Sequence, residues 1–211
     1  MIPHFVQGRL AEIQLFQPPA VLQMLDFRES EFLPLEFLFG NSNSPEVEIG
    51  CGTGGFLLER AARYPGINFL GIDRVSKWMK AGQKKSEKMD LGNLRFLKAH
   101  AASVLERLLP GTVLAFHIYF PDPWPKRRHR RRRLLTKDFL ELLRGRLVAG
   151  GRIETATDDE DYFMQIKKAV EGIPWGSRRE GDRRLFGEGK TNYENKYQAA
   201  GRRLYYLELQ K

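Results

Sequence analysis

From residue 46 onward the chain alternates short apolar segments with longer amphipathic segments, and this alternation limits the possible folds more than any other feature. Strands are expected at 46–49, 68–72, 94–98, 113–119 and 152–156. Helices are expected after them at 56–64, 75–89, 101–109, 136–148 and 159–171. A strand–helix pair repeated in this way favours a parallel, doubly wound α/β sheet with helices on both faces. A polar loop and a last strand at 203–209 are expected to complete the chain.

The length of 211 residues is enough for one domain with a full hydrophobic core. Residues 1–45 are broken up by prolines and are expected to form an N-terminal extension packed on the core domain, residues 46–211. The single cysteine, Cys51, cannot form an internal disulfide. No segment approaches the roughly 20 apolar residues of a membrane helix. We therefore expect a cytoplasmic protein that does not enter a membrane.

Three prolines alternate with other residues directly after the 113–119 strand, in the segment Phe120-Pro-Asp-Pro-Trp-Pro-Lys126. Proline fixes its own φ and pushes the preceding residue toward extended backbone, so Phe120, Asp122 and Trp124 are all expected to be extended. Asp122 is then expected just past the carboxyl end of a strand, which is the edge where open α/β sheets bind ligands. The alternative is a stiff loop whose carboxylate is only solvated.

The densest positive charge of the chain follows this turn, in residues 126–133. Lys126 and six arginines carry seven of the nine net positive charges, which leaves two for the rest of the chain. Charge concentrated in this way favours a polyphosphate partner. A solvated charged helix face is the alternative without a function.

The glycine-rich loop 50–55 lies between the first expected strand and its helix. Glycines allow a sharp turn and close approach to a ligand, but the loop by itself suits a dinucleotide as well as another nucleoside cofactor. Glu48 favours S-adenosylmethionine, because a carboxylate there would repel a pyrophosphate and attract an ammonium or sulfonium group. Asp73, at the end of the second strand, can accept hydrogen bonds from ribose hydroxyls. An ion pair between Glu48 and a lysine is the alternative.

Several motifs resemble those of known methyltransferases. Val47-Glu-Ile-Gly-Cys-Gly-Thr-Gly54 is similar to motif I of the class I enzymes, and Gly71-Ile-Asp73 to their second acidic motif. The segment 120–126, with the basic run behind it, closely resembles the signature of the bacterial tRNA (guanine-N7)-methyltransferases, the TrmB family. Residues 191–197 resemble the C-terminal segment of that family.

This resemblance implies a Rossmann-like class I fold with a mostly parallel sheet of about seven strands. It implies S-adenosylmethionine as cofactor, tRNA as partner and N7 of a guanine as methyl acceptor, with the guanine at tRNA position 46 in the variable loop expected. It implies no metal. Either a monomer or a homodimer is expected, with no obligate protein partner.

The resemblance also assigns site residues. The cofactor would contact Glu48, Gly50, Gly52, Asp73, His100 and Asp122. The guanine would contact Lys126, Asp158, Thr191, Asn192, Tyr193 and Glu194. The tRNA backbone would contact Arg128, His129, Arg130, Arg131, Arg132 and Arg133. His100 stands where the family commonly has an acidic residue, and its imidazole can accept a hydrogen bond from the adenine amino group.

Asp122 is the candidate catalytic residue. Guanine N7 already carries an in-plane lone pair, so the reaction needs positioning and electrostatics more than a strong base. The Asp122 carboxylate is expected to accept hydrogen bonds from guanine N1–H and the exocyclic amine, and to offset the charge that grows on the ring.

Three other functions are open. Asp122-Pro-x-Trp124 loosely resembles motifs of enzymes that methylate exocyclic amines, so another S-adenosylmethionine-dependent RNA base methyltransferase is one of them. A non-catalytic RNA-binding protein on the same fold is the second. An NAD-dependent dehydrogenase is disfavoured by Glu48, and His117 is expected to be a core residue of its strand rather than a catalytic group.

Overall fold

The structure is a computed structural model that describes residues 14–16, 32–33, 35–182 and 191–211. Its strands are β1 (Gln14–Phe16), β2 (Pro45–Ile49), β3 (Asn68–Asp73), β4 (Leu94–Lys98), β5 (Val113–Tyr119), β6 (Leu147–Thr157), β7 (Ser177–Gly181) and β8 (Tyr205–Gln210). Its helices are α1 (Leu35–Phe39), α2 (Gly55–Arg63), α3 (Ser76–Lys88), α4 (Ala101–Arg107), α5 (Lys137–Arg146), α6 (Glu160–Ala169) and α7 (Asn192–Ala199), with a 3₁₀ helix, η2, at Arg127–Arg132.

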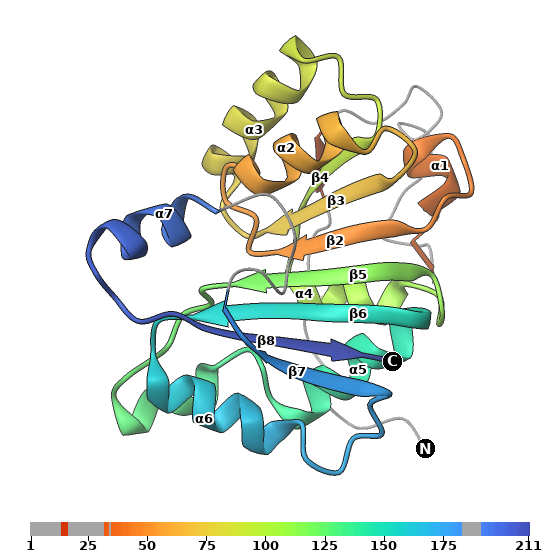
Figure 1. Ribbon diagram of the computed structural model, residues 1–211. Coiled ribbons are helices and arrows are strands. Elements are labelled where there is room, and N and C mark those ends of the chain that lie inside the picture. The colour runs from red at the N-terminus through yellow and green to blue at the C-terminus, as the bar shows by residue number, and fades with distance from the viewer. Residues whose placement is uncertain (1–13, 17–31, 34, 183–190) are drawn as a thin grey trace.

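The strands of the described residues form one sheet in the order β1-β4-β3-β2-β5-β6-β8-β7 (Figure 1). The five strands from β4 to β6 in this order run parallel to their neighbours. β8 is antiparallel to β6, and β7 is antiparallel to β8. The expected doubly wound, mostly parallel sheet is confirmed. The chain leaves β2 toward β4 on one side and returns through β5 on the other, so β2 and β5 form the switch point where such sheets bind ligands.

The loop expected between the helix at 159–171 and the last strand contains more regular structure than the sequence indicates. β7 and α7 both lie within it. β7 reads Ser-Arg-Arg-Glu-Gly and exposes four of its five residues, so this edge strand has no apolar alternation by which to recognise it. α7 is equally polar, and its first turn is stabilised by the cap residue Thr191.

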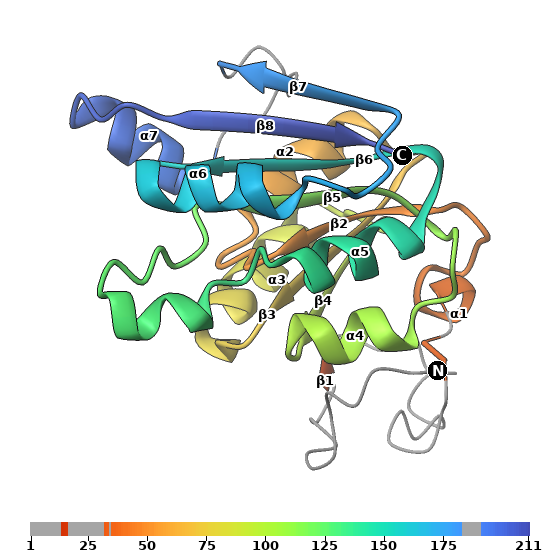
Figure 2. The same cartoon turned by 90° about the horizontal axis from the view of Figure 1, so that it is seen from below.

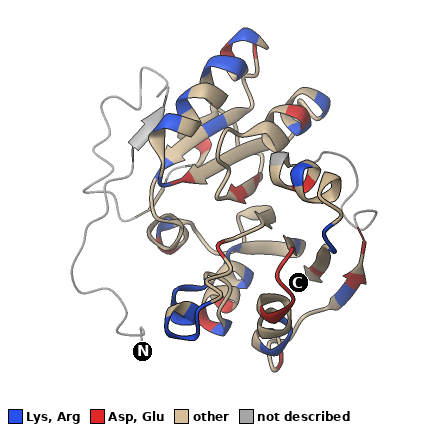
Figure 3. Ribbon diagram, turned by 90° about the vertical axis from the view of Figure 1, so that its left-hand side faces the viewer, with Lys and Arg blue, Asp and Glu red and all other residues tan. Residues whose placement is uncertain are grey.

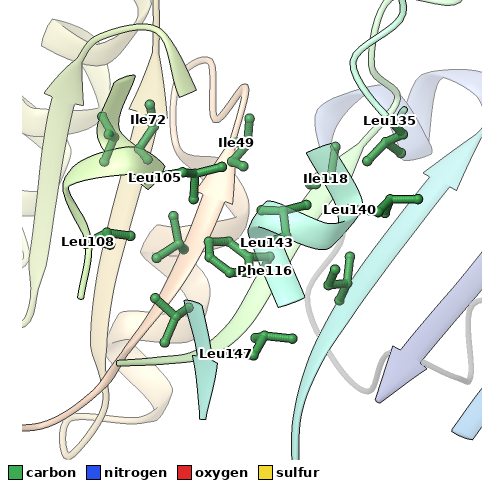
Figure 4. Packing of buried hydrophobic residues seen from close by; sticks show 14 of the residues in the cluster. Ile49, Ile72, Leu105, Leu108, Phe116, Ile118, Leu135, Leu140, Leu143 and Leu147 are labelled. Carbon is green, nitrogen blue, oxygen red and sulfur yellow. The ribbon is translucent and has the colours of Figure 1, made fainter. Parts of the chain in front are cut away.

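Helices lie on both faces of the sheet (Figure 2). Side chains alternate between these faces, and each face has its own apolar cluster. On β5, Phe116 and Ile118 pack with α4, α5 and α6, together with Leu140 and Leu143 (Figure 4). The smaller cluster joins α2 and α3 to the opposite face around Phe96. His117 and Tyr119 alternate with these apolar residues along β5, so their side chains lie on the face that α2 covers.

The described parts of the first 45 residues lie against this sheet. β1 pairs with β4 in antiparallel register, so the described sheet has eight strands where about seven were expected. Leu33 is buried, and its backbone N–H donates to Arg107 O at 2.8 Å. Leu38 is fully buried, and its carbonyl accepts from Arg95 Nε at 2.9 Å. Among the described helices, none has the length and apolar character needed to cross a membrane.

Candidate active site

A cavity of about 240 Å³ lies where the carboxyl ends of β2 and β5 meet α3 and α7. Figure 1 shows α7 at the edge of the sheet toward which the arrowheads of the parallel strands point. The wall comprises Glu48, Gly50, Cys51, Gly52, Thr53, Gly55, Phe56, Trp78, Tyr119, Thr191 and Tyr193. The glycine loop and the residues Thr191 and Tyr193, far apart in the sequence, thus face the same space.

The glycine loop owes its shape to left-handed backbone. Gly50 has φ of 80° and Gly52 has φ of 54°, values that side chains other than glycine rarely allow. Gly52 N donates to Asp73 Oδ2 at 2.9 Å, and Val75 N donates to Asp73 Oδ1 at 2.9 Å. Asp73 therefore joins the loop after β2 to the loop after β3, and its two oxygens keep lone pairs for further donors.

Glu48 is the carboxylate of the described cavity wall. Its side chain is buried, and its Oε2 has no hydrogen-bond partner among the described residues. Burial raises the pKa of Glu48 to about 8; His117 lowers this pKa and Asp73 raises it. No ion pair with a lysine forms within the described residues, so that alternative is not supported. A buried carboxylate without a partner fits a ligand that carries a cation, such as S-adenosylmethionine.

The proline turn differs from its predicted backbone. Phe120 has φ of 50° and Trp124 has φ of 44°, so both are left-handed rather than extended. Phe120 N donates to Ala156 O at 2.7 Å, which continues the β5–β6 pairing. The Trp124 ring lies 4.9 Å from the Arg132 guanidinium and edge-on to His129. These contacts offset a conformational cost on the order of 1 kcal/mol per residue.

Asp122 is exposed just past β5, as predicted, and its charge acts on two tyrosines. Burial raises the pKa of Tyr162, in α6, to about 12, and Asp122 contributes to the rise. Burial, Asp158 and Asp122 also raise the pKa of Tyr197, in α7. The Asp122 carboxylate is thus electrostatically coupled to both α6 and α7. Asp158 accepts a hydrogen bond from Arg202 Nη1.

Residues 191–194 place different side chains in different surroundings. Thr191 lines the cavity, and its Oγ1 accepts from Glu194 N at 3.0 Å. Tyr193 also lines the cavity and is 57% exposed. Glu194 is buried, and its carboxylate accepts from Tyr206 OH at 2.9 Å. The side chain of Asn192 lies outside the described residues.

The basic segment is an exposed turn of 3₁₀ helix with one exception (Figure 3). Lys126, Arg128, Arg130, Arg131 and Arg132 are exposed, and His129 is half-buried. Arg133 is only 3% exposed and is bound by acceptors of the protein itself. The expected contact between Arg133 and the tRNA backbone is therefore wrong for this geometry, because its guanidinium cannot reach a phosphate in solvent.

His100 does not reach the cavity wall. It is exposed and extended at the start of α4, and its side chain makes no cap hydrogen bond. In the described part of the chain, no group of acidic, histidine and cysteine side chains is arranged to hold a metal ion.

Sequence reasoning did not anticipate the charged network beneath the cavity. His117 is fully buried, as predicted for a core residue, but its Nε2 lies 3.0 Å from Glu46 Oε2 and its Nδ1 lies 3.0 Å from Glu154 Oε2. Burial by itself would lower the pKa of His117, but the two carboxylates raise it above its ordinary value. Tyr119, in the cavity wall, donates from its OH to Glu154 Oε2 at 2.7 Å.

Both carboxylates of this network are also paired with arginines. Arg60 donates to Glu46 from Nε at 2.8 Å and from Nη2 at 3.0 Å. Arg152 donates to Glu154 from Nε at 2.6 Å. Burial would raise the pKa of each carboxyl, but His117 and the arginines lower both to about 2. The only sequence signal was that glutamates and a histidine recur at alternate positions of apolar strands.

Comparisons with known proteins identify relatives of this chain. Residues 42–207 match the family described as "Putative methyltransferase". The tRNA (guanine-N(7)-)-methyltransferase of Geobacter metallireducens is 35% identical, over 82% of this chain and 85% of that protein. The enzyme of the same name from Rubrobacter xylanophilus is 33% identical, over 87% of this chain and 85% of that protein.

Solved structures of low sequence identity share the fold. An antibiotic-related methyltransferase superposes with a TM-score of 0.58 at 19% identity, covering 94% of this chain and 99% of that one. A SAM-dependent O-methyltransferase from Thermotoga maritima superposes with a TM-score of 0.55 at 13% identity, covering 84% of this chain and 63% of that one.

Proposed function

Because this chain belongs to the tRNA (guanine-N(7)-)-methyltransferase family, we propose that it transfers the methyl group of S-adenosylmethionine to N7 of a guanine in tRNA. One observation supports this function above the others. Glu48, a buried carboxylate whose Oε2 has no hydrogen-bond partner among the described residues, lines a glycine-loop cavity at the sheet edge where the Pro-Asp-Pro turn presents Asp122. The site thus combines a place for a cationic cofactor with a carboxylate for the base.

Glu48, Gly50, Gly52 and Asp73 would hold the cofactor, which supplies an electrophilic methyl group when bound. Glu48 Oε2 would accept a hydrogen bond from the ammonium group, which would also stabilise the ionised carboxylate. Asp73 would accept from the ribose hydroxyls with the lone pairs that Gly52 N and Val75 N leave open. His100 has no part in this proposal.

Asp122 would hold the guanine by accepting from N1–H and the exocyclic amine. N7 becomes positively charged as it accepts the methyl group, and a nearby carboxylate stabilises that charge. Asp122 is exposed in the free protein, so a base lying over it would exclude water and strengthen this interaction. Thr191 and Tyr193, which line the cavity, would contact the same base. No general base is required.

The exposed members of the basic segment would bind the tRNA backbone. Arg128, Arg130, Arg131 and Arg132 lie on the 3₁₀ helix η2, which begins at Arg127, five residues after Asp122. Arginine presents several donors in a planar fork that matches a phosphate. Contacts so close to the turn would bring a guanine of the bound strand toward the cavity.

The decisive experiment is incubation with unmodified tRNA and methyl-labelled S-adenosylmethionine, followed by nucleoside analysis. Label in 7-methylguanosine supports the proposal. Label in another nucleoside would show a different RNA base methyltransferase, and tRNA binding without label would favour a non-catalytic binding protein. Asp122→Asn, run in parallel, should lower the rate at saturating tRNA by about 100-fold or more.

The finer points of the proposal have their own measurements. Mapping the modified position in the product tRNA tests the expected guanine at position 46 of the variable loop. Sedimentation of the purified protein distinguishes a monomer from a homodimer, and full activity of the isolated chain would support the absence of an obligate protein partner. A tRNA substrate also supports a cytoplasmic location for the proposed reaction.

A further inference from the structure

Arg133 is the last arginine of the basic segment, but it lies in the interior. Its side chain is 1% exposed. All three guanidinium nitrogens have acceptors: Nε donates to Pro123 O at 2.7 Å, Nη1 to Gln165 Oε1 at 2.8 Å and Nη2 to Asp161 Oδ2 at 2.6 Å. A buried cation is tolerated only when its donors are satisfied in this way. Because the side chain is also buried, this guanidinium is not accessible to a phosphate in solvent.

The three acceptors come from two separate parts of the chain. Pro123 directly follows Asp122 in the proline turn, whereas Asp161 and Gln165 lie on one side of α6. The Arg133 guanidinium also lies 4.8 Å from the centre of the Tyr162 ring, and Tyr162 OH accepts from Leu135 N at 2.9 Å. Arg133 therefore joins the proline turn to a helix packed on the core.

The proline turn has few other means of attachment. Proline has no N–H, so residues 121, 123 and 125 cannot donate to a neighbouring strand or helix. Trp124 has left-handed φ, a conformation that persists only when its surroundings hold it. A carbonyl of this turn bound by a buried cation is a strong constraint, because hydrogen bonds to charged groups are stronger than those between neutral groups.

We propose that Arg133 is a positioning residue: it anchors the Pro-Asp-Pro turn to α6 through Pro123 O and so fixes Asp122 relative to the cavity. This inference rests on the proposed function and deepens it. Arginines of the basic segment then have two different roles, which the residue type alone does not reveal. The exposed arginines bind RNA, and Arg133 sets the geometry of the turn.

The test compares Arg133→Lys with Arg131→Ala, which removes an exposed arginine of the same segment. Lysine keeps the charge but cannot serve three acceptors in a planar fork. We expect Arg133→Lys to lower the single-turnover rate at saturating tRNA and cofactor by about 10–100-fold, because small displacements of a positioned group are costly. Its tRNA affinity and the salt dependence of binding should match those of the wild type.

A second variant covers the case in which Arg133→Lys does not fold. Gln165→Ala removes one acceptor without changing charge, is compatible with the helix, and leaves Asp161 to hold the guanidinium. It should lower the same rate by several-fold, on the order of the loss of one such hydrogen bond, with thermal stability reported alongside.

Two results would overturn the inference. Arg133→Gln removes the charge, so a salt slope reduced by about one unit in that variant would show a phosphate contact instead of an internal anchor. Wild-type rates in both Arg133→Lys and Gln165→Ala would show that the anchor does not position Asp122. If the wild-type protein methylates a base other than guanine, the rates are compared for that product. If it methylates no base, the salt slope of tRNA binding still tests the inference about Arg133.

Discussion

Replacing Glu48 with glutamine should stabilise the ligand-free protein and remove its affinity for the cofactor. The carboxylate is buried without a hydrogen-bond partner for Oε2 in the described residues, and its pKa rises from 4.5 to about 8. A carboxyl group with a raised pKa favours the folded state in its protonated form. Its contribution is therefore complete below pH 4.5 and is lost as the pH rises to about 8.

The size of this effect follows from the shift. Each unit of pKa corresponds to about 1.4 kcal/mol, so the shift at Glu48 is equivalent to about 5 kcal/mol at most above pH 8. Water entry and side-chain movement reduce the measured value. For a chain of 211 residues, 1 kcal/mol changes the melting temperature by about 2–4 °C. Glu48→Gln should thus melt near the wild-type temperature at pH 5 and about 10 °C higher at pH 9.

The assay is thermal unfolding of both proteins between pH 5 and pH 9 without ligand, followed by the same series with S-adenosylhomocysteine. The difference between the two proteins is the informative quantity, because the acid titration of Glu46 and Glu154 is common to both. The ligand should raise the melting temperature of the wild type and not that of the variant. Glu106→Gln, at an exposed position of α4, is the matched control.

A difference in melting temperature between Glu48→Gln and the wild type that stays constant over this pH range, as it should for Glu106→Gln, would contradict a raised pKa of Glu48. A wild type that becomes the more stable protein as the pH rises would contradict it as well. Either result would mean that Glu48 is already ionised and satisfied in the free protein. The cavity would then lack the unpaired carboxylate from which the cofactor proposal is argued.

Three other perturbations test separate parts of the structure. Arg131→Ala should weaken tRNA binding and reduce the slope of log affinity against log salt by about 0.9, and an unchanged slope in a filter-binding series would contradict the phosphate contact. Gly82→Ala should weaken cofactor binding by about 10-fold or more, since the added Cβ would lie 2.5 Å from Thr53 O in the cofactor loop. Gly92→Ala, whose added Cβ meets nothing within 4 Å, should bind normally in the same calorimetric titration. His117→Gln should lower the free energy of unfolding, measured in urea at pH 6, by about 3–5 kcal/mol, because the raised pKa keeps the wild-type imidazole charged at that pH. The difference in free energy between the two proteins should become smaller at higher pH. An equal difference at all pH values would argue against a buried imidazolium.

The order of strands and helices was predictable because its signals are local. Apolar alternation and glycine or proline boundaries place β2 to β6 and their helices within a few residues of the expected positions. The polar edge strand β7 was missed, because an exposed strand needs no apolar face. The glycine loop and Asp122 were found because turn stereochemistry depends on neighbouring residues and a strand end locates the ligand-binding edge.

Arg131 and Arg133 show where sequence reasoning ends. Both are arginines in one basic run, yet Arg131 is exposed and Arg133 is bound by acceptors on α6 about thirty residues later. His117 likewise contacts Glu46, which is 71 residues away, and Glu154, which is 37 residues away. The backbone of Trp124 follows the same rule, since its packing with Arg132 and His129 outweighs the local preference for extended backbone.

The fold class, the glycine loop and the place of the proline turn could therefore be predicted from the sequence, because periodicity, glycine and proline act over a few residues. The tertiary structure alone decided which charges are buried and which face solvent. The reason is that burial and ion pairing depend on elements brought together from distant positions. In this protein that distinction separates an arginine available to RNA from one that anchors the turn, and a carboxylate paired at the core from one left open to a ligand.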